Sequence, residues 1–295
     1  MIEGQEDVTW DDWVALARAC EEHGVESLFR SDHYLSVSGH AGRGSLDAWA
    51  TISALAAVTS TVRLGTLVSP ATFRHPSELA KVAVTADQVS GGRVELGLGT
   101  GWLEAEHEAY GFPFPPLRER MEMLGEQLEL LRLEWGDGPA SFDGRHYRVR
   151  ELDALPKPVQ RPGPHLLVGG RGGPRSLALA ARFADEYNAL VGTPAECAEL
   201  RRDLDEACRA AGRDPMPLSI MTGWLVGEDR AELDDRTARL ADWYGPPGDD
   251  WIAGTVDEAS ERLRELSEAG VERVMCQHLL HRDLGAVEQI GRLSR

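Results

Sequence analysis

Short β-type runs alternate with amphipathic helices along all 295 residues, and this alternation limits the chain to few architectures. Helices are predicted between the runs because apolar residues recur at helical spacing and are bounded by capping and breaking residues, as at Thr9 and Pro76. The β-type runs cover residues 1–3, 27–30, 62–67, 94–98, 165–168, 186–190, 218–226 and 273–277. Strands joined through helices pair in parallel by right-handed crossovers, and eight such units predict an α/β fold, a (β/α)8 TIM barrel.

Two departures from a regular barrel are expected. Residues 143–145 read Asp-Gly-Arg and lie between Phe142 and the pair His146 and Tyr147, which is typical of a β-hairpin insertion. The run at residues 1–3 is short, so the first strand should be shortened. A doubly wound open sheet is the competing architecture, but no G-x-G-x-x-G follows a first strand. We therefore predict a single barrel domain over residues 1–295.

Charge and composition exclude several classes of partner. The chain has 31 Lys and Arg against 49 Asp and Glu, a formal net charge of −18, which opposes binding to nucleic acid or an anionic membrane. No apolar run approaches the roughly 18 residues of a membrane span and residues 1–7 are acidic, so a cytoplasmic protein is expected. The cysteines lack a C-x-x-C spacing and are predicted to be buried, reduced thiols: Cys20, Cys197, Cys208 and Cys276.

A glycine-rich segment after the fifth β-type run is a candidate anion site. In a barrel the active site lies at the carboxyl ends of the strands, where residues 169–173 read Gly-Gly-Arg-Gly-Gly. Glycines allow close approach to a ligand, and the helix predicted from Pro174 directs free N–H groups toward the segment. Arg171 and Arg175 would add charge-assisted contacts. The alternative is a tight turn with solvated arginines.

Histidines supply the other candidate chemistry. Asp32 and His33 follow the second β-type run, and a carboxylate beside an imidazole can fix its tautomer and raise its pKa for proton transfer. The alternative is a structural histidine. His278 and His281 have an H-x-x-H spacing, but they straddle a strand end and further ligands are not evident, so no metal site is predicted.

Several motifs occur in order along nearly the whole chain. They are the segment 24–33 (Gly-Val-Glu-Ser-Leu-Phe-Arg-Ser-Asp-His), the turn 99–102 (Gly-Thr-Gly-Trp) followed by 110–113 (Tyr-Gly-Phe-Pro), and 155–162 (Leu-Pro-Lys-Pro-Val-Gln-Arg-Pro) leading to 168–170 (Val-Gly-Gly). Together these motifs resemble the bacterial luciferase-like superfamily, and they are most similar to its actinobacterial branch that uses the deazaflavin coenzyme F420.

The resemblance implies a barrel that holds a flavin or deazaflavin ring at the strand carboxyl ends. The ring would lie against a bulge with a non-prolyl cis peptide at Leu67-Val68, next to Ser69. Its phosphate would lie on residues 169–172, which are Gly169, Gly170, Arg171 and Gly172. Thr100 and Gly101 match positions that contact ring or phosphate. His33, with Asp32, matches the acid/base position beside the reactive ring, where a positioned group contributes about 10²–10⁴-fold.

The resemblance gives coenzyme F420 as the expected cofactor and FMN as the alternative. The leading hypothesis is an F420-dependent oxidoreductase acting on a small organic molecule. The alternatives are a reduced-FMN monooxygenase and a flavin-binding protein without catalysis. An acidic coenzyme tail would need arginines such as Arg43 or Arg171, and because related barrels often dimerise, a homodimer stays open.

Three residues are assigned to the substrate pocket: Glu3, Trp102 and His278. The loop 36–44 should also shape this pocket. Glucose-6-phosphate dehydrogenases of the family carry a tryptophan shortly after the Asp-His pair and a glutamate after the Gly-Thr-Gly turn. This chain lacks that tryptophan and has Trp102 in place of the glutamate, so sugar-phosphate activity is not expected.

Overall fold

The computed structural model describes residues 1–40, 42–190, 192–242 and 244–294. The strands of its main sheet are β1 (Ser27–Arg30), β2 (Arg63–Pro70), β3 (Val94–Gly99), β6 (His165–Gly170), β7 (Glu186–Ala189), β8 (Leu218–Gly227), β9 (Ile252–Thr255) and β10 (Arg273–Gln277). Their order is β1-β2-β3-β6-β7-β8-β10, with β9 beside β8, and every pair is parallel. All carboxyl ends of these strands therefore lie at one end of the sheet.

The first residues of the chain join the two edge strands. The Ile2 N–H donates to the Phe29 carbonyl at 2.9 Å, and the Ser31 N–H donates to the Ile2 carbonyl at 3.1 Å. On the other side, the Met1 ammonium donates to the Cys276 carbonyl at 2.9 Å, and the His278 N–H donates to Met1 at 3.0 Å. This short first strand lies between β1 and β10, as the sequence predicted for a (β/α)8 barrel.

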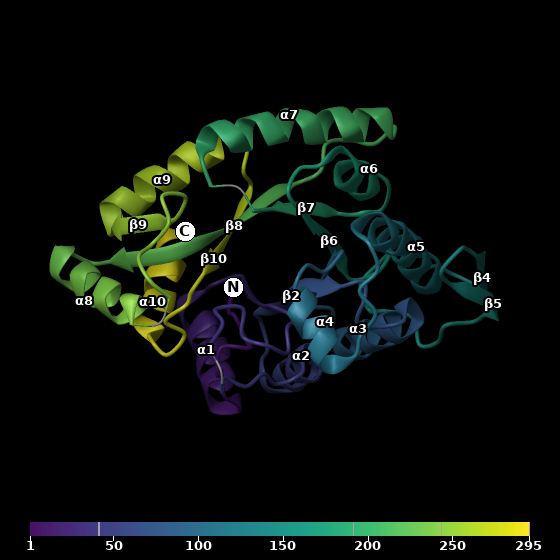
Figure 1. Ribbon diagram of the computed structural model, residues 1–295, viewed down its shortest axis with the longest axis horizontal. Helices are drawn as coiled ribbons and strands as arrows, with labels where there is room; N and C mark the ends of the chain where they lie inside the picture. Colours follow the sequence, from purple (N-terminus) through teal and green to yellow (C-terminus); the bar gives the residue numbers. More distant parts are fainter. Residues whose placement is uncertain (41, 191, 243, 295) are drawn as a thin grey trace.

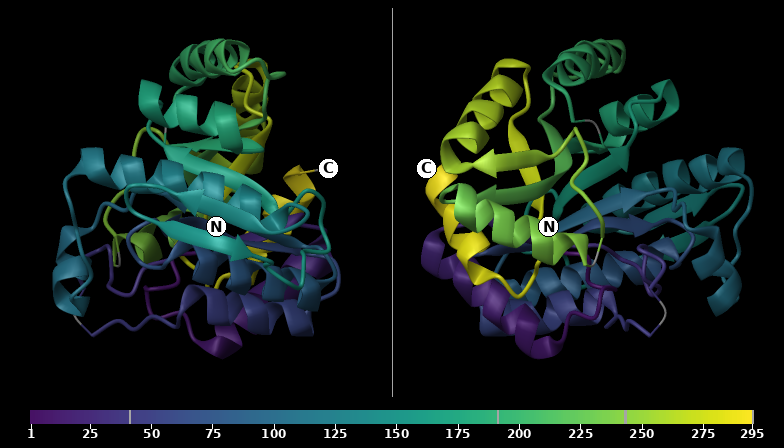
Figure 2. Two further views of the ribbon diagram at one scale, coloured as in Figure 1. Left: turned by 90° about the vertical axis from the view of Figure 1, so that its right-hand side faces the viewer. Right: turned by 60° about the vertical axis from the view of Figure 1, so that its left-hand side comes forward.

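Helices surround the sheet (Figures 1 and 2). They are α1 (Trp10–His23), α2 (Ala48–Val58), α3 (Pro76–Ser90), α4 (Glu104–Tyr110), α5 (Leu117–Trp135), α6 (Pro174–Phe183), α7 (Pro194–Ala210), α8 (Arg230–Ala241), α9 (Val256–Glu268) and α10 (Leu284–Leu293). The predicted start of α1 is confirmed, because the Thr9 side chain caps it and its end follows at left-handed Gly24. In both figures the last helix, α10, lies beside the first, α1.

The barrel interior is filled with apolar side chains below the strand carboxyl ends. Phe29, Leu67, Leu167 and Met275 are buried there and pack with Met1. A second, larger apolar layer lies between the strands and the helices, with Leu64, Leu96 and Leu166 among the buried side chains. Because the interior is packed, a ligand can reach only the ends of the strands.

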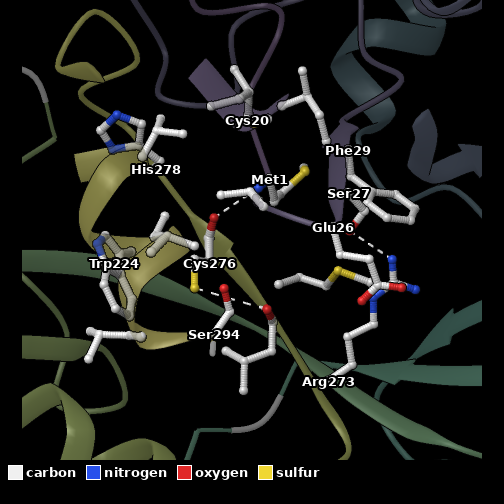
Figure 3. A pocket seen from close by; sticks show the side chains of 18 of the residues that line it. Met1, Cys20, Glu26, Ser27, Phe29, Trp224, Arg273, Cys276, His278 and Ser294 are labelled. Atoms are coloured by element: carbon white, nitrogen blue, oxygen red, sulfur yellow. Dashed lines mark hydrogen bonds between the residues drawn. The ribbon is translucent and has the colours of Figure 1, made fainter. Parts of the chain in front are cut away.

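A cavity of about 340 Å³ lies beside the short first strand, between β1 and β10 and the helices that cover them (Figure 3). Its lining is mainly apolar and includes Leu16, Cys20 and Ile290. The buried Met1 ammonium donates its hydrogen bond here, and burial lowers its pKa. The cavity thus lies mainly between these strands and the helices α1 and α10.

Other sequence predictions have mixed outcomes. The hairpin insertion is confirmed as the antiparallel pair β4 (Ala140–Asp143) and β5 (Arg148–Leu152), although its second strand begins after Tyr147. The short elements α4 and β9 were not predicted. Apolar residues at helical spacing also predict a helix near residues 231–243; the helix observed there, α8, ends at Ala241, and Trp243 lies outside the described residues.

All the cysteines are free and buried, as predicted. Burial raises the pKa of the Cys20 thiol to about 12 and that of Cys276 to about 11, so both stay protonated. Among the described residues, no helix is both long and apolar enough to span a membrane.

Candidate active site

The parallel sheet brings three predicted segments to the same end of the barrel. Residues 31–34 follow β1, residues 100–102 follow β3, and residues 171–173 follow β6. Each segment leaves the carboxyl end of a parallel strand, which is where barrels build their ligand sites. The contacts of each segment show what its side chains can do.

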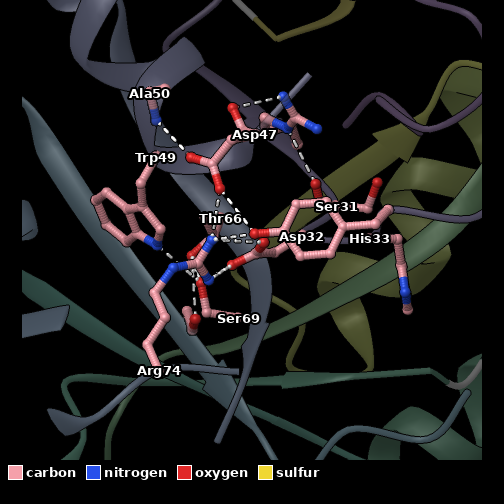
Figure 4. A network of polar contacts seen from close by, with 12 residues as sticks. Ser31, Asp32, His33, Asp47, Trp49, Ala50, Thr66, Ser69 and Arg74 are labelled. Carbon is pink, nitrogen blue, oxygen red and sulfur yellow. Dashed lines mark hydrogen bonds and ion pairs between the residues drawn. The ribbon is translucent and has the colours of Figure 1, made fainter. Parts of the chain in front are cut away.

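Asp32 belongs to a buried polar network with Ser69 and Arg74. The His33 side chain points away from this network (Figure 4). Its carboxylate accepts hydrogen bonds from Ser69 Oγ at 2.6 Å and Arg74 Nη1 at 2.6 Å. Arg74 also contacts Asp47 at 3.0 Å. The prediction that Asp32 orients His33 is therefore wrong. Consecutive side chains on extended backbone point to opposite sides, so Asp32 and His33 cannot face each other.

His33 is instead paired with Glu106, which the sequence analysis missed. The His33 Nδ1 lies 2.8 Å from Glu106 Oε2, and the carboxylate is fully buried on α4. The other oxygen of Glu106 accepts hydrogen bonds from the backbone N–H groups of Tyr34 and of Leu35, the latter at 2.9 Å. Glu106 thus fixes both the imidazole and the backbone that follows it.

The Glu106 carboxylate also changes the acidity of His33. Burial by itself lowers the pKa of His33, but the hydrogen bond and the charge of Glu106 outweigh burial and raise it. Glu3 and Asp32 add smaller effects in the same direction. The pKa of Glu106 is lowered, because the His33 interaction and the backbone N–H groups outweigh its burial. His33 can therefore hold a proton near neutral pH and release it to a partner.

Trp102 lies beside His33 with most of its side chain exposed. Its relative exposure is 63%, and its ring is 5.5 Å from the imidazole at an interplanar angle of 77°. The preceding turn is held by Gly101, which has a φ of +76° and a carbonyl that accepts a hydrogen bond from Arg120. The Thr100 hydroxyl donates to the same carbonyl at 3.3 Å. The turn thus presents the aromatic face of Trp102 to solvent next to His33.

β2 has a bulge where the resemblance placed one. The Leu67-Val68 peptide is cis, as expected, and the pairing of β2 with β3 shifts register between Thr66 and Ser69. Neighbouring glycines make room for Val68, because an added Cβ at Gly99 or Gly169 would come within 2.7 and 2.8 Å of its methyl groups. The Ser69 side chain does not face the ligand end: it donates to Asp32 and accepts from Trp49 Nε1 at 3.0 Å.

The glycine segment after β6 has the features of an anion site. α6 begins at Pro174 with no side-chain cap, so its first N–H groups have no capping partner at Gly173. Gly172 has a φ of +74° and its N–H donates to Tyr187 Oη at 2.9 Å. Gly170 lets this hydroxyl approach, since a Cβ there would lie 2.3 Å from it.

Two exposed arginines flank this segment. Arg171 and Arg175 make no hydrogen bond or ion pair with any other described residue, although most arginines of the chain do. Arg43, the other arginine considered for an acidic tail, is instead paired with the buried Glu6. Free positive charge at this end of the barrel therefore lies next to the glycines.

The remaining predicted pocket residues have different positions. Glu3 is buried within electrostatic range of His33 and accepts hydrogen bonds from the side-chain amides of Gln5, at 2.7 Å, and Gln277. His278 lines the cavity shown in Figure 3, with Nε2 3.0 Å from the Asp283 carbonyl oxygen. Burial lowers its pKa to about 3. The assignment of His278 to the substrate pocket stays a prediction.

One group of side chains in the described residues has the composition and spacing of a metal site. Glu95, His165 and Glu186 lie at the amino ends of β3, β6 and β7. Arg273 already contacts Glu95 at 2.8 Å and Glu186 at 3.2 Å, so a guanidinium provides the positive charge here. We treat this group as an ion-pair network at the opposite end of the barrel.

Comparison with known proteins gives consistent matches over most of the chain. A sequence model of the luciferase-like monooxygenase family matches residues 2–251. An F420-dependent hydroxymycolic acid dehydrogenase of Mycobacterium tuberculosis is 30% identical over 289 residues, which cover 95% of this chain and 76% of that protein. An F420-dependent glucose-6-phosphate dehydrogenase of Nakamurella multipartita is 35% identical over 229 residues, covering 75% of this chain and 66% of that protein.

A solved structure has the same fold. An F420-dependent secondary alcohol dehydrogenase in complex with an F420-acetone adduct superimposes with a TM-score of 0.84 at 20% identity. The match covers 99% of this chain and 96% of that one. The barrel architecture therefore agrees with that of a solved enzyme from end to end.

Proposed function

The chain belongs to the luciferase-like monooxygenase family, and from this premise we propose that it is an F420-dependent oxidoreductase that transfers a hydride between the deazaflavin ring and a small organic substrate. The observation that carries the proposal is the similarity to an F420-dependent dehydrogenase over 95% of this chain. The paired His33 and Glu106 at the strand carboxyl ends supply the proton chemistry that such a reaction needs.

The glycine segment fits the phosphate and acidic tail of this coenzyme. Residues 169–172 would hold the phosphate, together with the first N–H groups of α6. Arg171 and Arg175 would pair with the negative charges of the tail, since neither has a partner elsewhere in the described chain. The donor set is thus suited to an anion on a protein whose net charge of −18 otherwise repels one.

The β2 bulge fits the ring. Ser69 follows Leu67 and Val68 in β2, and its hydroxyl group is hydrogen-bonded to both Asp32 and Trp49. Asp32 would therefore support the ring through this network and would not transfer protons. Thr100 and Gly101, in the turn after β3, remain proposed contacts of the ring or phosphate.

In the proposed reaction the chain handles a proton. When bound, the deazaflavin would supply the hydride chemistry at the substrate carbon. His33 takes the proton of a substrate hydroxyl through Nε2, because Nδ1 is held by Glu106. Glu106 keeps the ring oriented and stabilises the imidazolium that results, and Trp102 would cover the substrate beside it. Glu3 remains a proposed substrate-pocket residue.

A reduced-FMN monooxygenase is the second candidate, because the matching family is described by that activity. The two are distinguished by measuring turnover of oxidised F420 without oxygen, and product formation with reduced FMN in the presence of oxygen. We expect only the anaerobic F420 reaction. Product that requires oxygen and reduced FMN would reject the proposal, and binding without either activity would indicate a flavin-binding protein without catalysis.

A further inference from the structure

The surroundings of His33 are negatively charged. Three carboxylates raise its pKa: Glu106 through a hydrogen bond and charge, and Glu3 and Asp32 through charge. Glu106 is buried and contacts His33 and the Leu35 N–H group. Asp32 is buried and paired with Arg74. Glu3 is different, because only the neutral amides of Gln5 and Gln277 are bonded to its side chain in the described residues. Its charge is therefore not balanced by an ion pair.

The arginines of the neighbouring segments already have partners. Arg74 is paired with both Asp32 and Asp47. Arg120 donates to the carbonyls of Gly101 and Pro115 and lies over the Phe114 ring. These contacts leave Arg74 and Arg120 without a free guanidinium to offer a substrate anion. Among the described residues, the free guanidinium groups at this end of the barrel, Arg171 and Arg175, flank the glycine segment after β6. The Met1 ammonium acts on Glu3 through its charge without forming an ion pair with it.

Two further arginines belong to the same end of the barrel. Arg43, in the loop after β1, is paired with buried Glu6. Arg282, after β10, contacts Asp12 at 3.3 Å. Each would have to leave a carboxylate to bind a substrate anion, which costs the energy of the existing pair.

The exposed contact beside His33 is apolar. Trp102 presents an aromatic ring that is 63% exposed, and no charged group is bonded to it. Like charges repel more strongly in a partly buried site than in bulk water, so a carboxylate without an ion-pair partner disfavours an anion beside it. An uncharged substrate is not repelled by this carboxylate.

We propose that the substrate oxidised at His33 is an uncharged alcohol, and that Glu3 and Trp102 make the site reject alcohols carrying a phosphate or carboxylate. This rests on the proposed F420 function. The alcohol loses a hydride from its carbinol carbon to oxidised F420 and its hydroxyl proton to His33. The products are a ketone or aldehyde, reduced F420 and the imidazolium, which returns its proton to solvent.

The test compares matched alcohols that differ by one anionic group. F420 binding is first measured by fluorescence, because its failure would reject the proposed function and not the substrate class. Oxidation of 2-propanol against lactate, and of glucose against glucose 6-phosphate, is then followed by loss of deazaflavin fluorescence. We expect kcat/KM for the uncharged member to be higher by about tenfold or more. Equal or faster oxidation of either anionic member would overturn the proposal.

Collisional quenching decides the question if no alcohol in the panel is oxidised. Iodide and acrylamide are anionic and neutral quenchers of the bound deazaflavin, and each is compared with free F420. We expect protection against iodide to exceed protection against acrylamide by at least about threefold, as repulsion of about 0.7 kcal/mol would give. Equal protection against both would contradict the proposal.

A charge-neutral variant separates Glu3 from the general acidity of the protein. Glu3→Gln should raise the quenching of bound F420 by iodide. It should also lower the ratio of kcat/KM for the uncharged alcohol to kcat/KM for its anionic counterpart by about fivefold. The matched control is Glu199→Gln, which removes the same charge from the exposed face of α7. If both variants have the same effect, overall charge and not Glu3 excludes the anion, and the assignment to Glu3 fails.

Discussion

Two histidine–carboxylate pairs lie at opposite ends of the barrel. His33 contacts Glu106 at 2.8 Å at the carboxyl ends of the strands, and His165 contacts Glu186 at 3.0 Å at the amino ends. In both pairs burial alone would lower the pKa of the histidine, and the carboxylate raises it instead. Local geometry alone therefore does not distinguish a catalytic pair from a structural one.

The surroundings of the two pairs are what differ. Glu186 forms an ion pair with Arg273, and Arg273 also contacts Glu95. The charge of the Glu186 carboxylate is therefore balanced within a buried network. Glu106 contacts no arginine in the described residues, and its charge acts on His33 and two backbone N–H groups. The first network stabilises the fold, whereas the second leaves a histidine able to exchange a proton beside exposed Trp102.

The largest predicted difference is between the kcat values of two variants, each of which lacks one of these histidines. We expect His33→Ala to lower kcat by about 10²–10⁴-fold without changing F420 affinity, because a positioned acid/base contributes that much. His165→Ala should leave kcat unchanged. Turnover and fluorescence titration of both variants check this, using the alcohol that the wild type oxidises fastest. Equal loss of kcat in the two variants would remove the distinction between the pairs.

The amino-end network should dominate stability. Arg273→Met removes the guanidinium shared by Glu95 and Glu186, while Glu95 keeps Arg63 and Glu186 keeps His165. We expect a loss of about 1.5–3 kcal/mol in the free energy of unfolding. Urea denaturation gives this value. The control Arg282→Met removes an exposed pair with Asp12 and should cost less than about 1 kcal/mol. Similar losses in both variants would show that the buried network carries no special stability.

Glu106 should set the pH dependence of the reaction. Alcohol oxidation needs neutral His33, so kcat/KM should rise with pH through a pKa above the ordinary value of about 6.5. Glu106→Gln removes the charge that raises this pKa, and the rise should move to lower pH. The pH–rate profiles of both proteins test this. An unmoved midpoint would mean that Glu106 does not tune His33.

The smallest effects are expected at the glycine segment. Arg171→Ala and Arg175→Ala should each weaken F420 binding by about three- to tenfold at low salt, because exposed charge pairs contribute about 1 kcal/mol. FMN, which lacks the longer acidic tail, should be affected less. Arg150→Ala on the exposed hairpin strand β5 is the control. Unchanged F420 binding in both loop variants would place the tail elsewhere.

The sequence was sufficient for elements with a clear period and clear boundaries. α6 begins at Pro174 and ends at Phe183 as predicted, because a proline at its first position and an apolar stripe define it. The glycine segment and the Leu67-Val68 bulge were also found before the structure, the second only through resemblance. The short elements α4 and β9 were missed because seven and four residues show too little periodicity.

The carboxylate that contacts His33 could not be found from the sequence. α4 carries Glu104, Glu106 and Glu108, and only Glu106 is buried. Nothing in the local sequence separates it from its neighbours, since its contact with His33 joins positions 73 residues apart. Asp32 was assigned to the wrong partner for a simpler reason. Alternation along extended backbone turns adjacent side chains to opposite sides, and it could have separated Asp32 from His33.

The most direct test of this account is an equilibrium titration of the purified protein with F420 and, separately, with FMN, followed by ring fluorescence. We predict saturable binding of F420 that is tighter than binding of FMN, and a loss of affinity for F420 as salt is raised, because its tail is bound by exposed arginines. Tighter binding of FMN, or no binding of either compound, would contradict the account.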